Sequence, residues 1–518
     1  MKKQLFSLAI VFSIILPVSA QRFVTEVFPS FTETSNITYA TNISVLTGTP
    51  TSVNLAMDVY QPAGITDTMA RRPLIIFLHE GSCLPPFINQ EPTGSRNDSA
   101  NVEMCERFAR RGYVVANIDY RLGWNPAGST VDIRRGTLIN ALFRAVQDAK
   151  SCVRYFRKDA ATANLYMIDS NRIILGGASN GGTVAVNYAC LQDSLQLSIP
   201  KYISSTTVPA YGFVAGQPYV SFASQGDQNG YGGIPALNNS NNSPGYGNNV
   251  QFVFSLGSVL GDSTWLTAGD APMVAFHNIS DPFTPYGNGI VYVPSIPPQS
   301  VVAISGSGAF IPMADQLGNN DCFNNPGFKS QYASDPYTIQ ANTLNGGHEG
   351  LYPFASPVPE TSPWDWFDSV ATVDGAVAYG LTVGAADTIY ANALLTNPDM
   401  SKIKAMKYID TIMGYLNPRI AYCLGLIPGL AVNNVTKNNH EVNIFPNPVT
   451  GFLVVKTTAQ DDLIRKIDIC DLTGRSVMHV NDIDETQITL RKDNIPSGVY
   501  LISIFTTSEK TIKKLVVQ

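Results

Sequence analysis

Continuous apolar runs alternate with helical patterns along the first 430 residues of the chain. Residues 72–82 (RPLIIFLHEGS) and 112–123 (GYVVANIDYRLG) are apolar runs that reach a glycine, and the segment between them has helical spacing. A long amphipathic pattern follows over residues 137–160, and the run RIILGG then leads into another helix from about Asn180. Apolar strands that alternate with helices are typical of a mostly parallel sheet. The pattern predicts an α/β fold with helices flanking the sheet.

Further elements are expected on both sides of this core. Residues 42–64 alternate in polarity around a Gly-Thr-Pro turn, which predicts an antiparallel hairpin. Residues 271–281 (APMVAFHNISD) predict another strand, and YTIQANTL at 337–344 has the same character. Helical patterns dominate residues 369–424.

The composition changes after Ile427. Residues 427–440 form a polar, asparagine-containing linker, and residues 441–518 are short alternating strands separated by Asn-Pro, Thr-Gly and Ser-Gly turns. This pattern predicts a small β-sandwich. We therefore expect a large domain at 21–426 and a second domain at 441–518.

The first twenty residues have the form of a secretory signal peptide. Two lysines precede an apolar run, and small residues at Val18 and Ala20 predict cleavage after Ala20. No other stretch is long and apolar enough to cross a bilayer, so we expect an exported protein without stable membrane insertion. Charged residues make up 14% of the chain with a net charge of −6 and no basic block, which argues against a nucleic-acid partner.

Export makes the seven cysteines informative, because an oxidising compartment permits disulfides. The order along the chain suggests the pairs Cys83 with Cys105, Cys152 with Cys190, and Cys322 with Cys423, while Cys470 lies in the other domain. The connectivity is not fixed by the sequence, and free buried thiols are the alternative for each pair. No CxxC or HxxxH spacing occurs, so we expect no metal site and no cofactor.

A candidate nucleophile lies where the strand RIILGG meets its helix. Gly177-Ala178-Ser179-Asn180-Gly181 is a G-x-S-x-G sequence, in which small neighbours let a strained serine stand exposed at a sharp turn. The alternative is an ordinary glycine-rich turn, but the strand before it and the helix after it favour a nucleophile elbow at Ser179.

A serine hydroxyl needs a base, and the base needs a carboxylate to orient it. Of the five histidines, His440 and His479 fall in the linker and the β-sandwich, and His79 and His277 precede the expected acid. The order Ser, Asp, His then leaves His348 as the base. Asp281, which follows the strand MVAF, is the preferred acid. The competing acids are Asp262, Asp270 and Asp315.

These residues resemble the α/β-hydrolase superfamily, and in particular its secreted carboxylesterase and lipase-like members. The resemblance covers about residues 40–425 and is carried by LAMDVYQPAG, PLIIFLHEGS, GGASNGG, FHNISDPFTPY and NGGHEG. It implies that His79-Glu80-Gly81-Ser82 is the oxyanion loop, which in the family is often His-Gly-Gly-Gly. The N–H groups of Gly81 or Ser82, with that of Asn180, would then stabilise the oxyanion. Glu80 and Ser82 depart from the glycine pattern and leave open which amide points inward.

The C-terminal domain resembles the sorting domain of the type IX (Por) secretion system of Bacteroidetes. Phe445-Pro446-Asn447-Pro448, DLTGR at 471–475, PSGVYL at 496–501 and the terminal KKLVVQ carry this resemblance. It implies transport across the outer membrane by that machinery, followed by release or surface attachment.

Together these features predict a secreted serine carboxylic ester hydrolase. Ser179, Asp281 and His348 would form its triad, with an acyl-enzyme intermediate and a small-molecule or polymeric ester as substrate. Two alternatives remain open at this point: a serine peptidase on the same fold, and a surface binding protein on an inactive hydrolase scaffold.

Overall fold

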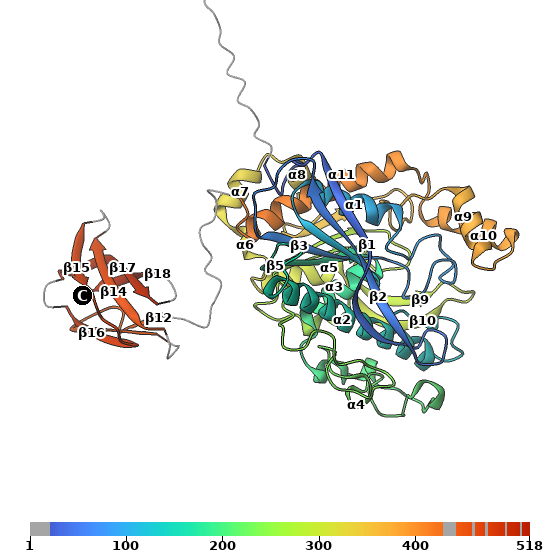
Figure 1. Cartoon of the computed structure of the whole chain (residues 1–518), viewed down its shortest axis with the longest axis horizontal. Helices are drawn as coiled ribbons and strands as arrows, with labels where there is room; N and C mark the ends of the chain where they lie inside the picture. The colour runs from blue at the N-terminus through green and yellow to red at the C-terminus, as the bar shows by residue number, and fades with distance from the viewer. Residues whose placement is uncertain (1–20, 428–441, 458–461, 472–474, 493–494, 508–509) are drawn as a thin grey trace, which may run out of the picture. The chain divides into compact units, whose positions relative to one another are not determined.

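The computed structural model describes residues 21–427, 442–457, 462–471, 475–492, 495–507 and 510–518. The chain divides into two compact units, with the boundary between residues 431 and 432 (Figure 1). The expected signal peptide at 1–20, and the linker apart from Ile427, lie outside the described residues. Among the described residues, no helix has the length and apolar character needed to span a membrane.

The N-terminal unit is built on an eight-stranded sheet with the order β1-β2-β4-β3-β5-β6-β8-β11. From β4 to β11 all neighbouring strands are parallel, while β1 and β2 form an antiparallel hairpin that joins the sheet at β4. The predicted α/β fold class is therefore confirmed. The strands are β1 (Ser30–Ser44), β2 (Thr51–Ala63), β3 (Arg72–Leu78), β4 (Val114–Ile118), β5 (Ile168–Ala178), β6 (Phe252–Leu256), β8 (Met273–Asn278) and β11 (Leu351–Phe354).

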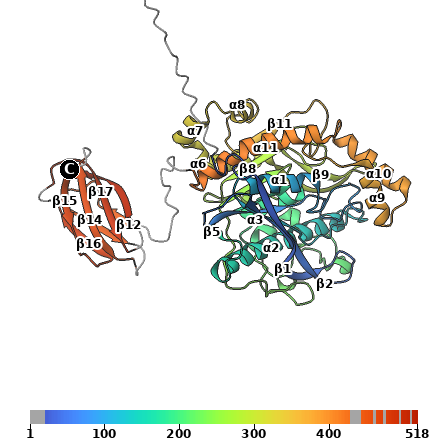
Figure 2. The same cartoon turned by 45° about the horizontal axis from the view of Figure 1, so that its top comes forward.

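Helices cover both faces of this sheet, as the two views show (Figures 1 and 2). Alternate residues of β3 belong to different cores: Leu74, Ile76 and Leu78 face one layer, and Ile75 and Phe77 face the other. This alternation explains the continuous apolar run, because both faces are buried. The first layer contains α2 (Val131–Ala161), α3 (Asn180–Cys190) and α5 (Ser307–Gln316); the second contains α1 (Ser99–Arg110), α6 (Asp321–Asn324), α7 (Pro326–Tyr332), α8 (Pro336–Asn342) and α11 (Lys402–Cys423).

The remaining elements of this unit lie outside the main sheet. A small antiparallel sheet has the order β7-β10-β9. Its strands are β7 (Val259–Leu260), β9 (Asn288–Val293) and β10 (Gln299–Gly306), and the remaining helices are α4 (Phe222–Gln225), α9 (Ser369–Ala378) and α10 (Val383–Thr396).

One predicted strand is a helix. Residues 337–344, expected as a strand, lie mostly in α8, whose N-cap Asp335 accepts a hydrogen bond from the Thr338 amide and whose first residue is Pro336. An aspartate cap followed by proline is a strong helix start, and here it outweighs the β-branched residues that favour a strand. The strand of this region is β11, which comes after His348 rather than before it.

The structure contains one disulfide among the predicted pairs. Cys322 in α6 and Cys423 at the end of α11 are joined, which confirms that pair. Cys83, Cys105, Cys152 and Cys190 are free and buried, so the other two predicted pairs are wrong. Cys83 and Cys105 belong to cores on opposite faces of the sheet, which explains why they do not meet.

Removal of this disulfide is expected to destabilise the N-terminal unit. The two cysteines are 101 residues apart, and the chain-entropy model gives about 4–5 kcal/mol for a loop of that length. Denaturant unfolding of a C322S/C423S variant should show a loss of that order in the free energy of unfolding. A loss below about 1 kcal/mol would show that the reduced chain keeps these helices together.

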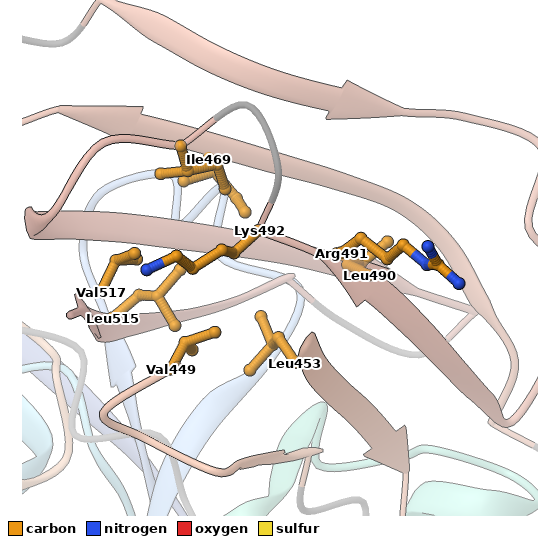
Figure 3. A pocket seen from close by; sticks show the side chains of 9 residues that line it. Val449, Leu453, Ile469, Leu490, Arg491, Lys492, Leu515 and Val517 are labelled. Atoms are coloured by element: carbon orange, nitrogen blue, oxygen red, sulfur yellow. The ribbon is translucent and has the colours of Figure 1, made fainter. Parts of the chain in front are cut away.

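The C-terminal unit consists of two antiparallel sheets around one core. The sheet orders are β12-β13-β16 and β15-β14-β17-β18, and the predicted β-sandwich is confirmed. Side chains of Val449, Leu453, Leu515 and Val517 face a common space of about 10 Å³ (Figure 3). That volume is no more than one water requires, so this space is a packed core rather than a ligand site. The strands are β12 (Val442–Phe445), β13 (Phe452–Thr457), β14 (Ile464–Asp471), β15 (Ser476–Val480), β16 (Gln487–Arg491), β17 (Gly498–Thr506) and β18 (Lys510–Val517).

Candidate active site

Ser179 lies at the turn between β5 and α3, at the carboxyl end of the parallel strands. Its backbone has φ 47° and ψ −114°, a region that a serine rarely adopts. Its N–H donates to the Leu256 carbonyl at 2.7 Å, and its own carbonyl accepts from Ser258 Oγ at 3.1 Å. Such strain, of order 1–3 kcal/mol, persists only where the surroundings hold it, and here the end of β6 does so.

Glycines next to Ser179 allow the backbones to approach closely. A Cβ added at Gly177 or Gly181 would lie closer than 3.0 Å to the Leu78 carbonyl oxygen, and at Gly181 also to that of His79. Both obstacles are backbone atoms of β3 and its following loop, which cannot turn aside as a side chain can. The glycines around the serine are therefore explained by the close contact between the elbow and the end of β3.

The loop after β3 has an unusual backbone. Gly81, Ser82 and Cys83 have φ values of 120°, 55° and 53°. Among the hydrogen bonds of the described residues, none is donated by the N–H of Gly81 or of Ser82. The Asn180 side-chain amide donates to Cys83 Sγ at 3.3 Å and ties this loop to the elbow. The two N–H groups therefore have no partner among the described residues, on a loop that is tied to the elbow.

His348 lies at the opposite end of the strands from Ser179, at their amino ends. In one row across the strands, Ala178 pairs with Leu256, Leu256 with Phe276, and Phe276 with Tyr352. Ser179 follows this row at the carboxyl end, whereas His348 precedes it by four residues at the amino end. At about 3.3 Å per residue the two are more than roughly 10 Å apart along the strands alone.

The partner of His348 is Asp315, one of the competing acids. His348 Nδ1 is 3.1 Å from Asp315 Oδ2, and Asp315 belongs to α5. The expected role of His348 as the base for Ser179 is incompatible with this placement. The error follows from the expected strand at 337–344: a strand there would have delivered His348 to the carboxyl edge, whereas the actual strand begins after it.

Asp281 lies at the expected carboxyl end, after β8, but the histidine that contacts it is His277 rather than His348. Its Oδ1 accepts from the amides of Phe283 and Thr284 at 2.8 and 2.9 Å, and its Oδ2 accepts from Thr361 Oγ1 at 3.1 Å. The nearest ring nitrogen that contacts it is His277 Nε2, at 3.7 Å. Asp281 therefore fixes the loop that contains Thr361.

That loop, residues 355–368, follows β11 and lies at the carboxyl ends of the parallel strands. The ring of Trp364 lies against Gly257, directly after the β6 residue that holds Ser179. In this fold the chain order places the third triad residue after the acid, at this edge of the sheet. The loop has threonine, serine, tryptophan and aspartate here and no histidine.

Two histidines lie at the carboxyl ends of the strands: both ring nitrogens of His277 have partners among the described residues, whereas only Nδ1 of His79 has one. His277 Nδ1 and Nε2 lie 3.0 Å from Ser307 Oγ and from the Thr284 carbonyl oxygen. His79 Nδ1 is 2.6 Å from the Glu80 carbonyl oxygen, and its ring stacks on Tyr120. Burial lowers the pKa of His79 to about 4.

Buried carboxyl groups surround the loop after β3. Glu80 Oε2 accepts from Ser362 Oγ at 3.1 Å. Burial, the charge of Glu80 and a hydrogen bond with Glu80 raise the pKa of Asp365 well above its ordinary value. Burial and the same charge raise the pKa values of Glu91 and Asp98 to about 7. The sequence offered one signal for this group, because Glu80 stands where the family pattern has glycine.

Helices α9 and α10 border this group of loops. Asn397, just after α10, donates through Nδ2 to the carbonyls of Ser362 and Asp365 at 3.2 Å. Phe87 of the loop after β3 packs against Tyr379 at the end of α9, with ring centroids 6.2 Å apart. The exposed side chains of the two helices include several large apolar ones, so this border is apolar: Val370, Val377, Tyr379, Val383 and Leu395.

A sheet of this order, with a strained serine at the turn after its fifth strand, defines an α/β hydrolase. The BD-FAE family model matches residues 57–291, and the Secretion system C-terminal sorting domain matches residues 443–518. The chain thus consists of an esterase-like BD-FAE α/β-hydrolase domain followed by a Por secretion C-terminal sorting domain. The BD-FAE match includes Gly81, Ser179 and Asp281 but ends before the 355–368 loop. The sorting domain implies secretion or a surface location.

Similar solved structures include esterase 2 of Thermogutta terrifontis. One, phosphoramylated by tabun, is 17% identical with a TM-score of 0.32 and covers 72% of this chain and 98% of that chain. A propionate-bound form is 17% identical with a TM-score of 0.31, covering 67% and 92%. No curated protein matches the chain.

Proposed function

We propose that the N-terminal unit is a serine carboxylic ester hydrolase with Ser179 as its nucleophile. The observation that carries the proposal is the strained serine at the strand–helix turn, beside a loop whose Gly81 and Ser82 N–H groups are available. Ser179 Oγ would attack the ester carbonyl, the N–H groups of Gly81 or Ser82 with that of Asn180 would stabilise the oxyanion, and water would cleave the acyl-enzyme. Asp281 would act as a positioning residue through Thr361.

Covalent labelling tests this assignment. The purified protein is treated with a fluorophosphonate, and the modified peptide is identified by mass spectrometry alongside hydrolysis of p-nitrophenyl acetate. We expect one phosphonylated serine, Ser179, and loss of hydrolysis in proportion to labelling. Full hydrolysis by a protein labelled at Ser179 would refute the nucleophile.

A non-catalytic ester-binding protein on the same scaffold is the second candidate. The observation that favours it is the absence of a histidine from the 355–368 loop, together with the engagement of both ring nitrogens of His277. This candidate predicts binding of an ester or its product without turnover. A serine peptidase is the other enzymatic alternative, and parallel assays on peptide and ester substrates separate it from an esterase.

His348 is expected to be dispensable for hydrolysis. It lies at the amino edge of the sheet, and its ring contacts Asp315. The H348Q variant should keep kcat/KM for p-nitrophenyl acetate within about twofold, because neither the His348 ring nor its partner Asp315 lies at the Ser179 end of the strands. A loss of tenfold or more, equal to about 1.4 kcal/mol, would restore His348 to the mechanism.

The sorting domain is expected to be dispensable for hydrolysis but not for export. All proposed catalytic groups precede residue 428, so a chain ending at Ile427 should keep kcat/KM within about twofold. We propose that export uses the Sec signal peptide and then the type IX machinery of a Bacteroidetes host. Fractionation of that host should find the shortened protein in the periplasm, and undiminished activity in the medium would contradict the sorting role.

A further inference from the structure

We propose that the Arg144 guanidinium is a binding site for a carboxylate, and that it selects esters whose acyl part carries a second, free carboxylate. The selection of esters rests on the proposed function, whereas the carboxylate site concerns binding alone. Three observations support the inference: a buried charge without a partner, terminal nitrogens that remain accessible, and contacts that connect Arg144 to the loops at the carboxyl ends of the strands.

Arg144, in α2, differs from the other buried arginines of the N-terminal unit. It is 7% exposed, yet within the described part of the chain its guanidinium donates no hydrogen bond and forms no ion pair. An unpaired charge in the interior is costly, so this one indicates a partner that comes from outside the chain. Each of the other buried arginines has a carboxylate or carbonyl partner: Arg72 with Asp67, Arg121 with Asp148, Arg134 with the Gly128 carbonyl, Arg154 with the Asn242 carbonyl, and Arg419 with Glu349.

The titratable groups around Arg144 do not balance its charge. Asp148 is the acid that acts on it, but the Nε and the backbone N–H of Arg121 already donate to that carboxylate at 2.9 Å. Burial raises the pKa of the Cys83 thiol to about 12, so this neighbour is neutral. Burial and the charge of Arg121 lower the pKa of Arg144 to about 10, and Arg144 is therefore still charged at neutral pH. These groups together carry one unbalanced positive charge.

The end of the Arg144 guanidinium is open to a ligand. Nε is enclosed, whereas the two terminal nitrogens, which also have no partner among the described residues, keep accessible surface. A Cβ added at Gly123 would lie 3.0 Å from one terminal nitrogen, and the φ of 136° there favours glycine, so this side stays open. Coplanar N–H groups match the two oxygens of a carboxylate. The chemistry of the site therefore suits a carboxylate ligand.

Contacts through two loops connect Arg144 to the candidate active site. Gly123, which lies next to its terminal nitrogen, donates its N–H to the Cys83 carbonyl at 2.8 Å. Cys83 Sγ accepts from the side chain of Asn180 at 3.3 Å, and Asn180 follows Ser179. β4 and β5 lie on either side of β3, so the loops after them are about 10 Å apart. A ligand that reaches from Arg144 to Ser179 extends over about that distance.

This separation defines the substrate class. One carboxyl group of the substrate would be the ester that Ser179 attacks, and the other would be the carboxylate that Arg144 binds. A dicarboxylic acid that is esterified at one end has both groups, at opposite ends of one acyl chain. Binding of its free carboxylate would hold the ester toward Ser179, and a neutral ester of the same length lacks this contact.

Calorimetric titration with adipate tests the site without hydrolysis. We expect the full mature chain to bind adipate at least about tenfold more tightly than the uncharged adipamide. R144M should weaken adipate binding by at least about tenfold. R172Q is the matched control, because Arg172 is partly exposed and its partner is Asp169 at 3.6 Å, and it should bind as the wild type does. No binding by the wild type, or equal binding by R144M, overturns the site.

Unfolding midpoints separate a ligand site from a structural role. Because the Arg144 charge is buried without a partner, ligand-free R144M should unfold at the wild-type temperature or above it. Adipate should raise the midpoint of the wild type and leave that of R144M unchanged. If R144M is destabilised or does not fold, R144K decides, since it keeps the charge without the planar fork. A stable R144K with adipate binding at least about fivefold weaker supports the site, and a destabilised R144K or one with wild-type binding overturns it.

Substrate preference tests the connection to Ser179. The measurement is the ratio of kcat/KM for mono-p-nitrophenyl adipate to kcat/KM for p-nitrophenyl hexanoate, its neutral analogue. We expect a ratio of at least about ten for the wild type and R172Q, caused by a lower KM, and a ratio of about one for R144M. A structural defect would reduce hydrolysis of both esters and leave the ratio unchanged, and that result overturns the selection.

The outcomes distinguish the carboxylate site from the proposed function. A protein that binds adipate through Arg144 but hydrolyses neither ester keeps the site and overturns the esterase. A protein that hydrolyses both esters at equal rates and binds no adipate overturns the site and leaves the esterase in place. Adipate binding that R144M loses, without a preference between the two esters, supports the site and overturns only the selection of substrates.

Discussion

Replacement of Ser179 by alanine is expected to lower kcat for p-nitrophenyl esters by at least about 10³-fold. In the proposed mechanism Ser179 Oγ forms the acyl-enzyme, and the residual rate would come from binding and from the N–H groups of Gly81, Ser82 and Asn180. The variant should fold as the wild type does, because its hydroxyl makes no hydrogen bond among the described residues while its backbone atoms make the contacts to Leu256 and Ser258.

The measurement is initial-rate hydrolysis with unfolding midpoints of both proteins. S179T provides a second comparison, because it keeps a hydroxyl while adding a methyl group at the strained turn. Equal rates for wild type and S179A would remove Ser179 from the mechanism and leave the binding-protein candidate as the better explanation of the fold.

The second large effect is expected for G181A. A Cβ at Gly181 would lie closer than 3.0 Å to the carbonyl oxygens of Leu78 and His79, so either the end of β3 or the start of α3 must move. Overpacking against backbone costs about 1–3 kcal/mol of stability or more. The movement would also displace Ser179 from the loop after β3, and a shift of about 1 Å can cost 10²-fold in rate.

G384A is the matched control. Gly384 lies in α10 with nothing within 4 Å of an added Cβ, so alanine there should change stability by less than about 1 kcal/mol, in the stabilising direction. Calorimetry and kcat/KM for both variants decide the matter. A G181A protein with wild-type rate and stability would mean that the contact between the elbow and β3 relaxes without cost.

The central strands and the elbow could be predicted from the sequence because their causes are local. β3 and β5 are buried on both faces, which produces unbroken apolar runs, and the elbow needs small residues at fixed spacing around Ser179. The two sheets of the C-terminal unit could also be predicted from the sequence, since short alternating strands with turn residues between them are a local pattern.

The position of His348 could not be predicted from the sequence in the same way. β11 has only four residues and includes Pro353, so it gives a weak signal beside the β-branched residues at 337–344. The helix cap at Asp335 favours a helix over these residues. Because a helix stands in place of the strand, His348 lies at the amino ends of the strands and not at their carboxyl ends. The expected strand at 337–344 thus led to a wrong position for His348, four residues after it.

The cysteine pairs and the carboxyl pair depend on contacts between distant segments. Cys83 and Cys105 point to different cores, which spacing along the chain does not reveal. Glu80 and Asp365 are separated by most of the unit, and only the fold brings their side chains together. The departure from glycine at Glu80 was visible in the sequence, but its partner was not.

The four buried thiols can report transient local opening of the N-terminal unit. Cys83, Cys152 and Cys190 are enclosed on one side of the sheet and Cys105 on the other, all with no exposed surface. An alkylating reagent can modify each only when its surroundings open transiently, whereas the partly exposed Cys470 serves as a fast reference. Cys83 is the informative one, because it follows Gly81 and Ser82 and contacts Asn180. Its alkylation rate, followed by mass spectrometry, would measure how often the loop after β3 moves away from Ser179. An ester that slows the alkylation of Cys83 would do so by holding that loop in place.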